Sequence, residues 1–309
     1  CTVEIPRLSI ITTDQFDSFL ERSRLHDIAR SSAQDCHIAN AFQKAALPEP
    51  LVHALRELIA HERAPLAVRS SSLLEDALQE PFAGVYATKM VPNNQFSADA
   101  RLRTLVEAVK FVYASTFFQD AKSYRKAMGR SDDEEKMAII IQKVVGLRHG
   151  DRFYPTISGV GRSYNFYSLG HAKPEEGVVS LALGLGKTIV DGGQSWTYCP
   201  AHPRSKPPFA STKEYLSQTQ TAYWAVNMGK PPSYDPIQET EYLCEGNLQH
   251  AEEDGVLTAL VSTYDPQSDR ITPGTGCPGP RVLDFSPVLD LKVVPLNDLV
   301  IRLLNACEE

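Results

Sequence analysis

The sequence lacks any long uninterrupted apolar segment. Apolar residues make up 42% of the 309 residues, but no apolar run reaches the roughly 18 residues that would indicate a membrane-spanning helix. A charged and then apolar secretory leader is not expected either. The pattern predicts a soluble protein and excludes a membrane as its main partner.

Closely spaced cysteines are also lacking. There is no CxxC pair, no histidines stand at zinc-ligand spacing, and the six cysteines are far apart: Cys1, Cys36, Cys199, Cys244, Cys277 and Cys307. This spacing argues against a disulfide framework and against structural zinc, so no metal ligands are predicted among these residues. Scattered thiols are typical of the reducing cytoplasm, where we expect the protein to be located, with the thiols as inert packing residues.

The chain has no large excess of charge of either sign. The formal net charge is -7, and the basic residues are scattered along the chain. Nucleic acids and anionic membranes select clustered basic residues, so neither is expected as a partner. The charge pattern favours a small-molecule partner.

The length fits one or two domains. The chain begins at Cys1 and stops at Glu309 inside a predicted amphipathic helix that opens at Pro295. We therefore expect boundaries within a longer protein at both ends, and one incomplete domain over residues 1–309.

Helical and strand-like patterns are mixed along the chain. Apolar spacing predicts two or three helices over residues 14–62 and one helix over 99–128. An acidic loop follows, with a lobe boundary near residues 129–136. Residues 202–237 are rich in proline and polar residues, which predicts an excursion or flexible loop. Strands are predicted at 65–68, 84–91, 137–145, 178–183 and 256–264, the last returning through a turn at 265–269 to a strand at 270–272.

Three clusters of polar or glycine residues stand at the ends of apolar runs. In the first, Arg69 and three serines end a predicted strand, and Gly84 follows. A guanidinium there can hold phosphate oxygens, while the serines and Gly84 could add close donors. The structural alternative is a surface arginine beside a serine-rich helix cap formed with Glu75.

The second cluster comprises Gln142, Lys143, Val144 and Val145 at the end of an apolar strand. A purine requires an apolar slot with backbone donors and acceptors at its edge, which such a strand supplies. A core strand that merely ends at the surface is an equally good interpretation of the spacing.

The third cluster is the segment from Gly184 to Gly193, which includes Gly186 and Lys187 and is preceded by Ser158 and Gly159. A P-loop is rejected because no glycine stands at the first position that the motif requires before Gly186. Glycines here allow either a close approach to a ligand or only a tight strand-to-helix turn.

Taken together, the order of these clusters resembles the N-terminal nucleotide-binding domain shared by phosphoenolpyruvate synthase and pyruvate phosphate dikinase. The matching segments are 68–71 with 75–76, 82–86, 114–115 with 124–125, 141–145, 158–160 and 184–186. They directly cover about residues 65–195.

The resemblance implies an α+β, ATP-grasp-like fold of two lobes that binds ATP with Mg²⁺. Family enzymes transfer phosphate from ATP to a histidine on a separate domain, which delivers it to pyruvate in a third domain. Arg69 would be the catalytic residue, binding phosphate and stabilising the charge of the transferring group. Residues 142–145 would lie along the adenine, and the loops around Gly84 and Gly159 would shape the phosphate pocket.

Some parts of the family pattern are not matched. No lysine in a glycine-rich segment precedes Thr13, and Lys187 stands where synthase-type relatives usually have glutamate. Magnesium ligands and the phosphohistidine and pyruvate-binding domains are expected beyond Glu309. The resemblance therefore implies a module that is inactive by itself. The alternatives are a non-catalytic nucleotide-sensing or interaction module, and a dikinase acting on a glucan or antibiotic hydroxyl.

Overall fold

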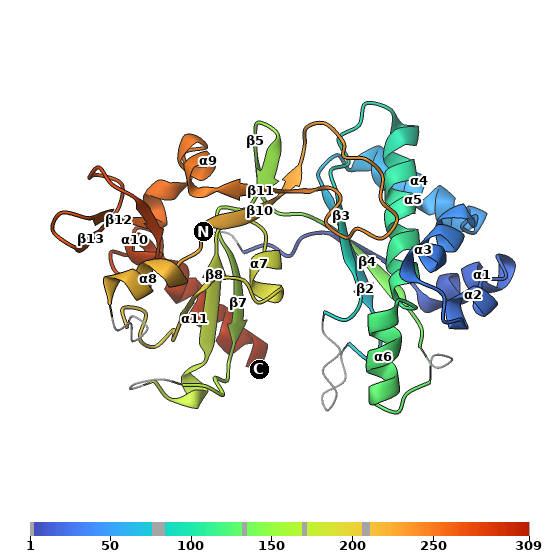
Figure 1. Cartoon of the computed structure of the whole chain (residues 1–309), viewed down its shortest axis with the longest axis horizontal. Coiled ribbons are helices and arrows are strands. Elements are labelled where there is room, and N and C mark those ends of the chain that lie inside the picture. Colours follow the sequence, from blue (N-terminus) through green and yellow to red (C-terminus); the bar gives the residue numbers. More distant parts are fainter. Residues whose placement is uncertain (1–2, 76–83, 132–134, 169–171, 206–210, 309) are drawn as a thin grey trace. The chain divides into compact units, whose positions relative to one another are not determined.

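The computed structural model in Figure 1 describes residues 3–75, 84–131, 135–168, 172–205 and 211–308. The chain forms two compact units. Unit 1 comprises Cys1–Phe153 and Val226–Cys244, and unit 2 comprises Tyr154–Ala225 and Glu245–Glu309. Helices and strands occur in both units, which confirms the α+β class.

The division between the units differs from the predicted lobe boundary near residues 129–136. The described residues of that segment lie within unit 1. The physical reason is that Met137 and Ile139 are fully buried in the core of unit 1, so the acidic loop returns the chain to the same sheet. The chain leaves unit 1 after Phe153 and returns to it at Val226.

The helices of unit 1 form because apolar residues recur at helical spacing, which gives each helix a face to bury. Phe16 and Phe19 of the first helix lie with their ring centroids 5.0 and 5.8 Å from that of Tyr113. Arg24, in a left-handed conformation, separates the first two helices. Residues 14–62 hold four helices rather than two or three, and residues 99–128 hold two rather than one: α1 (Thr13–Arg22), α2 (His26–Arg30), α3 (Asp35–Lys44), α4 (Glu49–His61), α5 (Ala98–Ser115) and α6 (Gln119–Ala127).

A four-stranded antiparallel sheet completes the core of unit 1. Its strand order is β1-β4-β2-β3, with Val68 and Ile139 on the face that is buried with the helices. Three of the strands confirm predicted strands, although β3 starts later than expected, and β1 has no predicted counterpart. The strands are β1 (Leu8–Ile11), β2 (Leu66–Ser71), β3 (Thr88–Val91) and β4 (Ala138–Lys143).

Beyond this sheet, the chain of unit 1 forms β5 (Leu147–His149) and β6 (Arg152–Tyr154). The returning chain of unit 1 pairs with β6 through Val226↔Phe153 and Asn227↔Arg152. It continues to β11 (Leu243–Asn247).

Unit 2 contains two three-stranded antiparallel sheets, ordered β7-β8-β9 and β13-β12-β14. The strand predicted at 178–183, the return at 270–272 and the helix after Pro295 are confirmed, whereas residues 256–264 begin with a 3-10 turn before the strand. The elements are β7 (Ser158–Arg162), β8 (Val178–Ala182), α7 (Lys187–Val190), β9 (Trp196–Tyr198), α9 (Leu248–Glu253), β12 (Val261–Asp265), β13 (Arg270–Pro273), β14 (Arg281–Leu283), α10 (Ser286–Leu289) and α11 (Leu296–Glu308), with 3-10 turns at Pro174–Glu176 and Leu257–Ala259.

Of the segment 202–237, predicted as an excursion or flexible loop, the structure describes residues 202–205 and 211–237. The second part contains α8 (Thr212–Gln218) and β10 (Ala222–Asn227). Ser211 caps α8 by accepting a hydrogen bond from the Glu214 N–H, and Tyr223 in β10 is only 1% exposed. The prolines that suggested a loop flank these two elements.

Candidate functional site

The register of the unit 1 sheet places Arg69 and Gln142 on one face. Arg69 lies opposite Ile140, and Ala67 lies opposite Gln142. Residues directly opposite each other in an antiparallel pair share a face, and alternate residues of a strand do so as well. Arg69 and Gln142 therefore extend from the same side of the sheet, two positions apart along β2 and β4.

This face, which we call the open face, carries an apolar floor. The register adds further residues to it: Leu8 and Ile10 from β1, Ile140 from β4, and Ala67 and Met90 from β2 and β3. Leu8 and Ile10 are 47% and 60% exposed, and the Arg69 side chain is exposed. An exposed guanidinium above accessible aliphatic side chains suits a ligand with an anionic part and an apolar ring.

The other residues of the second cluster are arranged differently. Lys143 pairs with Leu66 and so falls on the opposite side of the sheet from Gln142. Val144 is 7% exposed and its N–H donates to the carbonyl oxygen of Pro65 at 2.9 Å. Val145, by contrast, is 61% exposed. Of the four residues, Gln142 belongs to the open face and Val145 is accessible at the end of the strand.

The serines after Arg69 are hydrogen-bonded to Glu75. The Ser72 hydroxyl accepts from the Glu75 N–H at 3.3 Å, and the Glu75 carboxylate accepts from the Ser72 N–H at 3.0 Å. The Ser70 hydroxyl donates to the same carboxylate at 2.8 Å. This reciprocal pattern is that of a capping box, but residues 73–75 form a turn and not a helix. The helix-cap alternative therefore stays a prediction, and Arg69 is exposed beside these serines.

Gly84 precedes a buried polar cluster. Its φ is +82° with no atom near a Cβ position, so the backbone conformation itself requires glycine. Nearby, Arg125 is 0% exposed and donates to the Tyr86 hydroxyl at 3.1 Å. Burial raises the pKa of Glu135, against the opposing effects of Ser72, Arg125 and Tyr86. The Tyr86 and Arg125 matches to the family therefore form an internal support of unit 1.

In unit 2 the structure brings together Ser158, Gly184 and Gly186. The Ser158 hydroxyl donates to the carbonyl oxygen of Gly184 at 2.6 Å. A Cβ on Gly186 would lie 3.8 Å from the Ser158 Cβ. Gly159 lies next to the Leu181 side chain, which is 3.1 Å from its Cβ position. Ser158 thus supports the turn that leads from β8 into α7, residues 183–186, which we call the glycine turn.

Lys187 begins α7 and is largely buried. Its side chain is 14% exposed and lies 2.9 Å from the Asp191 carboxylate, one helical turn later. In this pairing the lysine supports its own helix. A cavity of about 230 Å³ lies beside it in unit 2, lined by residues that include Thr188, Gly193, Gln220, Trp224 and Glu245.

The described ranges hold neither a metal-binding cluster nor a membrane-spanning helix. No group of three or more His, Cys, Asp or Glu side chains there has an arrangement that could hold a metal ion. No described helix combines the length and hydropathy needed to cross a membrane.

Comparison with known proteins decides the family. Residues 1–229 match the family model described as "Pyruvate phosphate dikinase, AMP/ATP-binding domain". The chain belongs to this family. The match covers the open face of unit 1 and the glycine turn of unit 2, and it confirms the resemblance drawn from the ordered motifs.

The curated relatives that this chain matches are much longer proteins. The chain is 27% identical over 210 residues to "Rifampicin phosphotransferase" of Streptomyces sviceus, which covers 62% of the chain and 22% of that protein. It is 26% identical over 211 residues to "Probable phosphoenolpyruvate synthase" of Methanocaldococcus jannaschii, covering 62% and 16%. With "Phosphoenolpyruvate synthase" of Escherichia coli it shares 25% identity over 257 residues, covering 77% and 29%. The matches span less than a third of the length of each of these relatives.

Sequence reasoning missed several residues near the open face. Thr88 lies opposite Arg69, and Glu239 accepts a hydrogen bond from the Thr88 N–H at 3.4 Å. Lys89 forms a buried ion pair with Glu241. Lys89 places a charge in the short strand β3, which was the one local signal. Nothing in the sequence links it to a glutamate 152 positions later.

Proposed function

We propose that this chain is the ATP-binding module of a phosphoenolpyruvate synthase-like or pyruvate phosphate dikinase-like phosphotransferase, with an ATP-grasp-like fold. The observation that carries the proposal is the sheet register that puts Arg69 and Gln142 on one open face with an aliphatic floor. In this proposal the guanidinium of Arg69 binds phosphate oxygens and stabilises the charge of the transferring group. The purine lies along the end of β4, where Gln142 and Val145 are accessible.

The glycine segment of unit 2 is a second candidate for contact with a nucleotide. Gly184 and Gly186 lack side chains, and Ser158 holds the turn by its hydrogen bond to the Gly184 carbonyl. Backbone N–H groups of glycine turns can bind phosphate oxygens. We propose that Gly84 in unit 1 and Gly159 in unit 2 each contribute to nucleotide binding through the loops that contain them.

The full-length protein would transfer the phosphoryl group of ATP to a histidine on another domain, with pyruvate bound in a third. Phosphoryl transfer of this kind depends mainly on positioning and on charge stabilisation, which are the roles assigned to Arg69. Magnesium would supply further charge neutralisation when bound with ATP. The described residues include no group of three or more His, Cys, Asp or Glu side chains that could hold a metal ion, and no residue of this chain is assigned to magnesium.

Isothermal titration of the chain with ATP and magnesium tests the proposal. The wild-type chain should bind, and Arg69→Gln should weaken the affinity about tenfold or more, because a charge-assisted contact is lost. Arg56→Gln is the matched control, since Arg56 is an exposed arginine of the same unit, paired with Asp99. The absence of binding heat for the wild-type chain at millimolar ATP would count against the proposal. Equal affinities of the wild type, Arg69→Gln and Arg56→Gln for ATP would also count against it.

Lys187 favours a second function, a non-catalytic nucleotide-sensing or interaction module. It replaces the glutamate expected for synthase-type relatives and is paired with Asp191. This function predicts nucleotide binding without phosphate transfer. Incubating the full-length protein with ATP labelled in both its β and γ phosphates distinguishes the two, because only the phosphotransferase should acquire an acid-labile phosphohistidine.

A dikinase with another acceptor is the third candidate. The relative from Streptomyces sviceus is named for phosphate transfer to rifampicin, which makes an antibiotic hydroxyl, or a glucan hydroxyl, an alternative to pyruvate. Incubation of the full-length protein with ATP and each acceptor, followed by mass spectrometry, would identify the phosphorylated product.

A further inference from the structure

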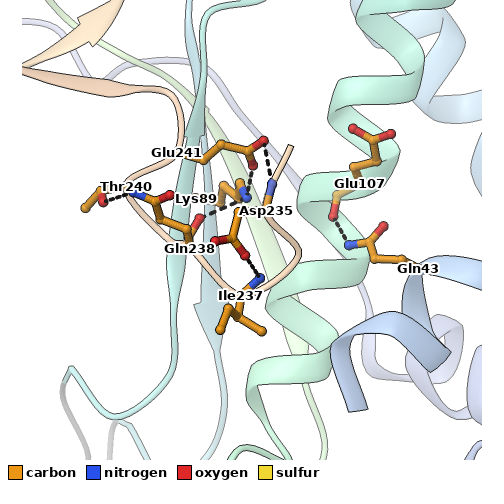
Figure 2. Close-up of polar contacts among 8 residues, drawn as sticks. All are labelled: Gln43, Lys89, Glu107, Asp235, Ile237, Gln238, Thr240 and Glu241. Atoms are coloured by element: carbon orange, nitrogen blue, oxygen red, sulfur yellow. Dashed lines mark hydrogen bonds and ion pairs between the residues drawn. The ribbon is translucent and has the colours of Figure 1, made fainter. Parts of the chain in front are cut away.

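A buried ion pair joins two parts of unit 1 that are 152 positions apart. Lys89 of β3 donates to the Glu241 carboxylate at 2.5 Å and to the carbonyl oxygen of Gln238 at 3.0 Å (Figure 2). The side chains of Lys89 and Glu241 are 3% and 2% exposed. These contacts hold residues 235–242, which we call the strap, against β3.

The remaining surroundings of the pair also fix its geometry. The Lys89 Nζ lies 4.6 Å from the ring centroid of Phe111 and 5.7 Å from that of Tyr242. The second carboxylate oxygen of Glu241 accepts from the Asp235 N–H at 3.3 Å, and the Asp235 carboxylate accepts from the Ile237 N–H at 3.0 Å (Figure 2). Glu241 thus neutralises Lys89 and shapes the strap at the same time.

The cost of burying two charges explains what the pair does. Desolvation offsets most of the Coulomb attraction, so a buried ion pair is a weak source of stability. Moving the strap relative to β3 would, however, leave a buried charge unpaired, which is strongly unfavourable. The pair therefore selects one position of the strap.

A second contact connects the strap to the open face. Glu239 accepts a hydrogen bond from the Thr88 N–H at 3.4 Å. Thr88 is the cross-strand partner of Arg69, so the strap contacts β3 at the residue that lies opposite Arg69. Residues directly opposite each other in an antiparallel pair extend from the same face of the sheet. The strap therefore acts on the edge strand directly beside Arg69.

We propose that Lys89 and Glu241 are positioning residues for nucleotide binding. Their ion pair fixes the strap, and the strap, through Glu239, fixes the part of β3 that places Thr88 beside Arg69. Neither residue of the pair contacts the nucleotide. The inference rests on the proposed ATP site of unit 1.

The test separates positioning from stability. In the double variant Lys89→Met/Glu241→Leu, apolar side chains replace both charges, so the fold should be retained while the strap loses the interaction that selects its position. Its dissociation constant for a fluorescent N-methylanthraniloyl-ATP should be about tenfold higher than that of the wild type, whereas its urea unfolding midpoint should stay close to the wild-type value. Lys136→Met, which breaks the exposed Lys136–Asp17 pair, is the control and should alter neither quantity.

Glu239→Ala provides an independent variant, since it removes the contact with Thr88 while leaving the buried pair intact. It should also weaken binding of the fluorescent ATP with little change in the unfolding midpoint. Wild-type affinity in both the double variant and Glu239→Ala would overturn the positioning role while leaving the ATP site in place. If the wild-type chain itself fails to bind the fluorescent ATP, the proposed function falls and the inference falls with it.

Discussion

Gly184 allows a quantitative test of how the glycine turn of unit 2 is built. Its φ is +80°, and a Cβ there would lie 2.7 Å from the Trp224 carbonyl oxygen and 2.9 Å from the Tyr223 Cβ. Gly192 has a similar φ of +72°, but no atom lies within 4 Å of its Cβ position. Gly184→Ala and Gly192→Ala therefore share the backbone strain and differ in the steric clash.

The two terms can be estimated separately. A left-handed conformation costs a residue with a Cβ about 1–2 kcal/mol, which both variants share. Overpacking adds about 1–3 kcal/mol at Gly184, because the opposing atoms are a backbone oxygen and a Cβ rather than the end of a flexible side chain. We expect Gly184→Ala to lower the free energy of unfolding by about 2–5 kcal/mol, and Gly192→Ala by about 1–2 kcal/mol.

Urea unfolding followed by far-UV circular dichroism measures both variants under the same conditions. Gly184→Ala should have the lower midpoint, with the slope of the transition unchanged. Equal losses in the two variants would refute the packing of the glycine turn against β10. In that case the glycine at 184 would be required by backbone conformation alone.

Two further predictions concern the interior of unit 1. Arg125→Met should lower the free energy of unfolding by roughly 3–5 kcal/mol, because it leaves the buried Glu135 carboxyl without its neighbouring cation. Urea unfolding measures this loss, and a loss below about 1 kcal/mol would contradict the prediction. Burial and Glu241 raise the pKa of Glu107 above its ordinary 4.5, which means that the folded state favours the protonated carboxyl. The stability that this group contributes is therefore fully present below pH 4.5, and it is lost as the pH rises through the folded-state pKa. Glu107→Gln should therefore gain in unfolding temperature relative to the wild type between pH 4.5 and neutral pH, and a constant difference would contradict the shift.

Local patterns predicted much of the secondary structure. The helical spacing of Phe16 and Phe19 and the apolar run of β4 are properties of neighbouring residues, and both elements formed where expected. The hydrogen bonds between Ser72 and Glu75 are also local. Arg69 and Gln142 could be named as candidates because each stands near the end of an apolar run, but only the register shows that they share a face.

Features that depend on distant pairing could not be predicted in this way. Leu8 pairs with Gln142, and the return of residues 226–244 to unit 1 follows from pairing with β6 and from the buried Lys89–Glu241 contact. A glutamate carries no local sign that it will neutralise a lysine in another strand. The division into units was missed for the same reason, since the acidic loop after Gly129 resembles a boundary although both of its ends enter one core.

The central claim is that the open face of unit 1 binds ATP. Titration of ¹⁵N-labelled protein with ATP, followed through the backbone amide signals of Arg69 and Gln142, tests it most directly. The account predicts that both signals shift and saturate with a single dissociation constant. The absence of a shift in either signal, or saturation at clearly different ATP concentrations, would contradict it.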